Sequence, residues 1–111
     1  MVAGAGRLVL ISGQVAFDAD GALVGKDDPA GQTRQVFENL RRCLAAVGAT
    51  FDDVVKLNYY LTDIYDLPDV REIRDEFIDT ERPPASTAVQ VVALALPDLL
   101  IEVEALALLA E

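Results

Sequence analysis

Hydrophobic and polar positions alternate along the chain with the two-residue period of β-strands in several segments. Apolar runs at 8–11 and 15–17 predict two short strands or one long bent strand, and turn-forming residues at 18–21 end it. Between 55 and 61, the side chains alternate as in a half-buried strand, with Val55, Leu57, Tyr59 and Leu61 on one face and Lys56, Asn58 and Tyr60 on the other. Strands are therefore expected at the start and in the middle of the chain.

Two other segments have the period of an α-helix. The first begins at Pro29, is capped by Asp27 or Asp28, and ends at Gly48. Its apolar face is formed by four residues at helical spacing: Val36, Leu40, Leu44 and Val47. The second helix follows a capping residue, Asp66, and a Pro-Pro pair ends it. Its apolar positions are Val70, Ile73 and Phe77.

The C-terminal third predicts a last pair of strands, at 87–94 and 100–109, joined by a turn at 97–98. The order of elements is then β-β-α-β-α-β-β in one domain spanning residues 1–111, an α+β fold with two helices on one face of the sheet. The segment 89–94 is apolar on both faces, so the second sheet face is expected to bury against another subunit. A closed, symmetric homo-oligomer is the expected assembly.

Composition and charge limit the classes of partner. The 111 residues include 9 Lys and Arg, 19 Asp and Glu and no His, which gives a net charge of −10. Nucleic-acid binding is not expected, because it needs clustered cations that neutralise phosphates. No apolar run is long enough to span a membrane, no export signal is recognisable, and the lone Cys43 cannot form an intrachain disulfide. We expect a soluble, cytoplasmic protein.

Few combinations of catalytic side chains are available. Without His and with one Cys, neither a Ser-His or Cys-His dyad nor a thiolate or imidazole metal site can form, so no metal or cofactor is expected. Gly4-Ala5-Gly6 lacks the other residues of a phosphate-binding loop and is interpreted as a turn. Glu102 and Glu104 share one face of the last strand. That face is either an exposed edge or part of a cleft in which a carboxylate orients a water, and composition does not decide between them.

Several short motifs occur together in an order typical of one family. The motifs are Ile11-Ser12-Gly13-Gln14, 32–40, Val47-Gly48-Ala49, 52–56, Leu61-Thr62-Asp63, Pro84-Ala85 and 101–105. The chain resembles the Rid (YjgF-like) family, because these motifs occur in the same order and at matching intervals in both. The resemblance implies a chorismate-mutase-like mixed sheet, assembled as a homotrimer with small-molecule clefts between subunits. Active members hydrolyse 2-imino acids to 2-keto acids and ammonia, and other members are described as L-PSP endoribonucleases.

The resemblance also implies roles for individual residues. Glu102 matches the glutamate that positions the hydrolytic water. An arginine that grips the substrate carboxylate follows Pro-Ala in such deaminases, and this chain has Ser86 there. Ser12 and Gly13 offer a hydroxyl and backbone amides to an anion, although Gly13 equally fits a bulge. Arg71 matches a polar cleft position of some relatives, or lies on a solvated helix face.

Two further differences from the family bear on activity. A tyrosine that precedes the first strand in relatives has no counterpart, and Arg82 is either a substitute for the missing arginine or a cation at a helix end. We therefore expect a Rid-like small-molecule-binding protein, a hydrolytic deaminase of an imine or enamine with weak or altered activity toward 2-imino acids. The alternatives are a non-catalytic, metabolite-sensing trimer and an endoribonuclease.

Overall fold

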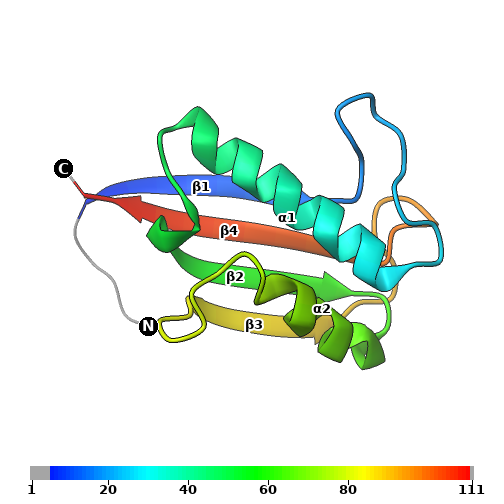
Figure 1. The fold of residues 1–111 in the computed structure, drawn as a ribbon. Coiled ribbons are helices and arrows are strands. Elements are labelled where there is room, and N and C mark those ends of the chain that lie inside the picture. The colour runs from blue at the N-terminus through cyan, green and yellow to red at the C-terminus, as the bar shows by residue number, and fades with distance from the viewer. Residues whose placement is uncertain (1–5, 111) are drawn as a thin grey trace.

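Four strands form one mixed β-sheet in the computed structural model, which describes residues 6–110. Gly4 and Ala5 of the predicted turn lie outside the described residues. In sheet order β1-β4-β2-β3, the strands are β1 (Arg7–Gln14), β4 (Ile101–Leu109), β2 (Val54–Leu61) and β3 (Ala85–Gln90). Two helices, α1 (Pro29–Ala46) and α2 (Leu67–Arg74), cover one face of this sheet (Figure 1). The predicted α+β class and the two helices on one face are confirmed.

The pairing of the strands differs from the predicted order at both ends of the chain. The first predicted strand is β1, but the second, at 15–17, lies beyond its end at Gln14 and forms only an isolated bridge from Phe17 to Leu23. β3 and β4 do not form a hairpin, because β3 pairs in parallel with β2 while β4 runs antiparallel between β1 and β2. The turn predicted at 97–98 does lie in a loop between β3 and β4. A local turn signal, however, does not determine which strand β4 pairs with after the loop.

The long helix begins and ends close to the prediction. Asp28 caps it, since Asp28 Oδ1 accepts a hydrogen bond from the backbone N–H of Gly31 at 3.1 Å, and Pro29 occupies the first turn. Asp27 has a positive φ of 59° and is not the cap. Val36, Leu40 and Leu44 are fully buried, but Val47 is 47% exposed, because it follows the last helical residue and leaves the apolar face.

Aromatic side chains connect the helices to the sheet. The ring of Phe37 on α1 lies 5.8 Å from that of Phe51, 6.4 Å from that of Tyr59 and 5.3 Å from that of Phe77, between centroids. α2 ends at Arg74, so Phe77 lies beyond the helix predicted to contain it and reaches the core from the following turn. Short 3-10 helices precede β2 and α2, at Phe51–Asp53 and Ile64–Asp66.

The sheet face opposite the helices is apolar at one end and polar at the other. Leu8 and Leu10 on β1 are 62% and 71% exposed, whereas Asn58, Tyr60 and Glu104 form the polar end. The prediction of a two-sided apolar strand at 89–94 is wrong, because β3 ends at Gln90 and lies at the sheet edge. The described residues contain no helix that is both long and apolar enough to cross a membrane.

Candidate functional site

Glu102 and Glu104 lie in the middle of the sheet and not at its edge. β4 is flanked by β1 and β2, which excludes the exposed-edge interpretation of this acidic strand. Both carboxylates are half-buried on the open face, while the alternate residues of the strand, Ile101 and Val103, point into the core with 1% and 0% exposure. The alternation predicted for this strand is confirmed, and it places two carboxylates on the face that the helices leave uncovered.

A bulge in β1 brings Gly13 beneath Glu102. The register moves from Ile11 opposite Ala105 to Gln14 opposite Val103, so β1 advances three residues while β4 advances two. A Cβ built on Gly13 would stand 2.5 Å from Glu102 Oε2 and 2.6 Å from Cδ. Gly13 therefore lies in a bulge, as one of the two interpretations of this residue predicted. The Glu102 carboxylate lies over the backbone of Gly13.

The two carboxylates have different surroundings. Glu104 Oε1 accepts hydrogen bonds from Tyr60 Oη at 2.7 Å and from Asn58 Nδ2 at 3.0 Å. The hydrogen bond that the Tyr60 hydroxyl donates to Glu104 is the main cause of the increase in the pKa of Tyr60 above its usual value. Within residues 6–110, no side chain or backbone N–H donates a hydrogen bond to Glu102. Glu104 is thus held by its neighbours, whereas the oxygens of Glu102 have lone pairs available.

A shallow hollow lies on the same open face beside these carboxylates. Its volume is about 430 Å³, and its lining includes the hydroxyl of Ser12, the Asn58 amide and the Glu104 carboxylate together with Leu10 and Leu106. Ser12 is therefore brought to the same face as Glu102 and next to the bulge at Gly13. Three of the residues singled out from sequence, Ser12, Gly13 and Glu102, lie together.

Ser86 and Arg71 lie on the other side of the sheet. In the parallel register, Ser86 on β3 is opposite Leu57, whose side chain points into the core beneath the helices. Ser86 and Arg71 line a small pocket of about 90 Å³ between β3 and α2. Ser86 and Arg71 therefore lie near each other but not near Glu102, because within one chain the sheet separates both residues from Glu102.

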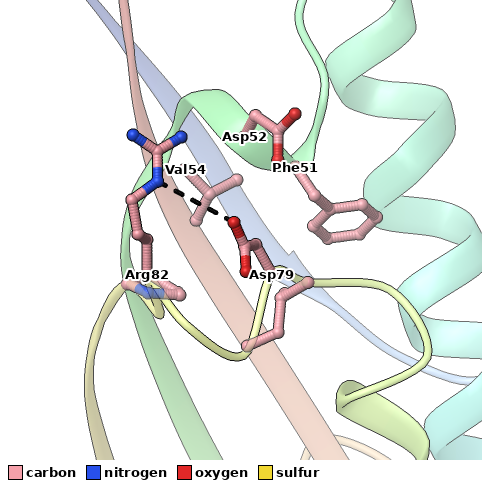
Figure 2. Close-up of a pocket in the computed structure, with 7 residues that line it drawn as sticks. Phe51, Asp52, Val54, Asp79 and Arg82 are labelled. Carbon is pink, nitrogen blue, oxygen red and sulfur yellow. Dashed lines mark ion pairs between the residues drawn. The ribbon is translucent and has the colours of Figure 1, made fainter.

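Arg82 lines a different pocket, shown in Figure 2. That pocket has a volume of about 120 Å³, and it includes Asp52 and Asp79 but not Ser86. Arg82 Nε lies 3.8 Å from Asp79 Oδ2, and the arginine side chain is 80% exposed. Arg82 follows α2 by eight positions and so is not a cation at the end of that helix. Within one chain, it does not replace the missing arginine.

Sequence reasoning missed two polar side chains beside Ser86. Tyr59 was predicted only as an inward-facing strand residue, and Arg74 was not singled out, yet both line the pocket between β3 and α2. The Tyr59 hydroxyl is buried and has no hydrogen-bond partner among residues 6–110, and burial raises the pKa of Tyr59 to about 12. The nearby Arg74 charge opposes this increase, although no well-formed hydrogen bond joins the two side chains. The sequence did contain one signal for Tyr59, because a tyrosine at an inward position of an alternating strand places a hydroxyl among apolar side chains.

Metal ligands do not gather around either group of residues. Among residues 6–110, no three side chains of His, Cys, Asp or Glu are close enough to hold a metal ion together. The polar groups that the structure offers to a ligand are the Glu102 carboxylate, hydroxyls, guanidinium groups and backbone amides.

Known proteins with similar sequences and structures belong to one group. The sequence profile of the family described as Endoribonuclease L-PSP matches residues 1–109. A RutC family protein of Pyrococcus horikoshii is 40% identical over 103 residues, which cover 93% of this chain and 80% of that protein. The Rid-family protein YyfB of Yersinia pestis has a TM-score of 0.84 at 44% identity, over 94% of this chain and 80% of the other. RidA of an Antarctic Psychrobacter has a TM-score of 0.86 at 35% identity, over 96% and 85%.

Proposed function

This chain belongs to the endoribonuclease L-PSP family, which includes the Rid and YjgF proteins, and on that premise we propose that it hydrolyses a small imine or enamine. The observation that carries the proposal is the Glu102 carboxylate. It is half-buried on the open sheet face, lies over the backbone of Gly13, and accepts no hydrogen bond from residues 6–110. A carboxylate in such surroundings is suited to accept a proton from water.

The proposed reaction needs one general base and no cofactor. Glu102 takes a proton from water as the oxygen bonds to the carbon of the C=N group, and the nitrogen takes a proton from solvent water. The resulting carbinolamine then loses ammonia: its C–N bond breaks as its hydroxyl proton passes to solvent water, which leaves a C=O group. The same carboxyl group can return its proton to the departing nitrogen, so that it serves as base in the first half and as acid in the second.

The proposed cleft lies between two copies of the chain. Ser86 and Glu102 are on opposite faces of the sheet, so a cleft that contains both must use Ser86 of one copy and Glu102 of another. The exposed Leu8 and Leu10 supply an apolar surface on the open face that association would bury. We propose the homotrimer that the family resemblance implies.

The substitution at Ser86 should slow the hydrolysis of 2-imino acids. A neutral hydroxyl replaces the bidentate, charged contact that an arginine makes with a carboxylate. Losing one such contact costs about ten- to a hundredfold in efficiency. The test generates an imino acid with an amino-acid oxidase, traps the surviving imine with semicarbazide, and compares this protein with an arginine-bearing relative. Equal rates would contradict the expected slow activity.

Glu102→Gln separates catalysis from simple binding in the same assay. The amide cannot take the proton from water, so imine hydrolysis should fall to the uncatalysed rate. Glu81→Gln is the matched control, because it removes the same charge from an exposed turn. If Glu102→Gln accelerates the reaction as much as the wild-type protein does, Glu102 is not the general base. If the wild-type protein itself does not exceed the uncatalysed rate, the protein is no deaminase, and ligand binding without turnover would favour a metabolite sensor.

Ribonuclease activity is not proposed, although the family description names it. The chain has a net charge of −10 and no His, so it offers neither a cationic surface for phosphates nor an imidazole for general acid–base cleavage. RNA degradation that copurifies with the protein and disappears in Glu102→Gln would reverse this judgement.

A further inference from the structure

The pocket between β3 and α2 is lined by hydrogen-bond donors. Its polar side chains are Tyr59 on β2, Ser86 on β3, and Arg71 and Arg74 on α2, and no carboxylate is among the lining residues. The remaining lining residues are apolar: Leu67, Val70 and Ala88. A small cavity with two guanidinium groups, two hydroxyls and apolar walls is complementary to an anion that accepts hydrogen bonds.

Tyr59 provides the second, independent sign of a ligand. Its side chain is only 3% exposed, and its hydroxyl has no hydrogen-bond partner within residues 6–110. Buried polar groups are nearly always paired, and an unpaired one is destabilising. Because Tyr59 is one of the residues that line the pocket, an acceptor bound there is in a position to complete the hydrogen bonding of its hydroxyl.

The two arginines are not equivalent. Arg74 already donates two hydrogen bonds to Asp75 Oδ1, at 3.0 Å from Nε and 2.9 Å from Nη2. Arg71, one helical turn earlier on the same face, forms no ion pair within residues 6–110. The charge of Arg71 is therefore the one available to a ligand, while Asp75 largely neutralises that of Arg74.

We propose that this pocket binds the carboxylate of the ligand, with Arg71 as its ion-pair partner and the Tyr59 and Ser86 hydroxyls as hydrogen-bond donors. The inference rests on the proposed function, since it assigns the carboxylate end of an imino acid or keto acid to this pocket. The cation then comes from α2 and not from β3. A volume of about 90 Å³ is far below that of a pocket for a complete drug-sized ligand, so it suits one charged end of a molecule.

Binding of keto acids tests the proposal without turnover. The full-length protein is titrated with pyruvate, with its neutral analogue pyruvamide and with inorganic phosphate, and amide and arginine side-chain signals are followed by NMR. Pyruvate should bind at least tenfold more tightly than pyruvamide, and it should shift the Arg71 side-chain signal. Equal affinity for pyruvate and pyruvamide would overturn the proposal, and tighter binding of phosphate would assign the pocket to phosphate instead.

Substitutions identify the residues responsible. Arg71→Gln should weaken pyruvate binding by about ten- to a hundredfold, as expected for the loss of a charged contact. Arg82→Gln removes the same charge from the exposed arginine of the other pocket and should leave pyruvate affinity unchanged. Equal losses in both variants would mean that overall charge, and not the pocket, attracts the anion, which contradicts the proposal.

Tyr59→Phe distinguishes a ligand-binding hydroxyl from a structural one. Because the hydroxyl is unpaired, its removal should leave the thermal midpoint unchanged or higher when no ligand is present, yet pyruvate affinity should fall severalfold. A lower midpoint together with unchanged pyruvate affinity would show that the hydroxyl serves the fold and not the ligand.

Failure of this inference and failure of the proposed function give different results. If Arg71→Gln binds pyruvate normally while Glu102→Gln abolishes imine hydrolysis, the protein is a deaminase and the pocket is wrongly assigned. If Arg71→Gln loses pyruvate binding while the wild-type protein hydrolyses imines no faster than the uncatalysed reaction, the pocket stands and the deaminase proposal fails.

Discussion

The Glu102 carboxylate lies across the backbone of Gly13, so close that a Cβ on Gly13 would stand 2.5 Å from Oε2 and 2.9 Å from Cγ. The backbone of Gly13 does not have a positive φ, so glycine is favoured there by the neighbouring side chain and not by its own dihedral angles. Any larger residue must displace Glu102 or move β1 away from β4.

A double-mutant cycle measures this relationship. Gly13→Ala should destabilise the protein by about 1–3 kcal/mol through overpacking. In a Glu102→Ala background, the same change should cost less than half as much, because the clashing carboxylate is gone. Urea unfolding of the four proteins gives the coupling. Additive effects would show that Gly13 and Glu102 are not in contact.

Alkaline unfolding should reveal the buried tyrosine. Burial raises the pKa of Tyr59 to about 12 in the folded protein, against a usual value near 10. Between these values the unfolded chain has lost the proton that the folded chain retains, so Tyr59 makes stability fall as pH increases through this window. The loss approaches about 2–3 kcal/mol above the folded pKa. Tyr59→Phe should unfold with a shallower pH dependence between pH 10 and 12, and an unchanged dependence would contradict the buried, neutral phenol.

Gln32 on α1 holds two loops in place and should be important for stability. Its side chain is fully buried, and Nε2 donates to Gly25 O at 3.2 Å and to Asp98 O at 2.8 Å. Its Oε1 accepts from the Leu100 N–H at 2.9 Å, just before β4 begins. Gln32→Leu keeps the volume but leaves buried backbone groups unpaired, which should cost about 2–4 kcal/mol in urea unfolding.

Gln35→Leu is the control for that measurement. Gln35 is on the same helix, but it is half-buried and bonds only to Asn39 at 2.9 Å. Its replacement should cost about 1 kcal/mol or less. Comparable losses in the two variants would mean that a change of helix polarity, and not the loop contacts of Gln32, lowers stability.

Leu10→Arg tests the proposed association through the open sheet face. Leu10 is 71% exposed in the single chain and lines the hollow beside Glu104. A buried, unpaired charge at an interface is costly, so the variant should have a lower mass than the wild-type trimer in light scattering. Val47→Arg places the same charge at the end of α1, on the helix side, and should keep the wild-type mass. A monomeric wild-type protein, or an unchanged mass for Leu10→Arg, would contradict assembly through this face.

Local signals in the sequence predicted where both helices begin and the alternating faces of β2 and β4, but not the end of α2 or the extent of β3. Asp28 followed by Pro29 predicts where α1 begins, because capping and a fixed proline φ depend only on neighbouring residues. The shared face of Glu102 and Glu104 follows in the same way from the alternation of a strand. Ordered motifs indicated the family, which the profile match over residues 1–109 shows.

Tertiary structure alone decided which segments meet. Whether Glu102 is at an edge or in the centre depends on the partners of β4, and these are set by contacts far apart in the sequence. The same long-range pairing places Ser86 on the helix side of the sheet and Glu102 on the open face. Likewise, Tyr59 was predicted to point inward, but only the packing of α2 over β3 left its hydroxyl unpaired beside Arg71. Periodicity determines which way a side chain points, whereas packing between distant segments determines what it faces.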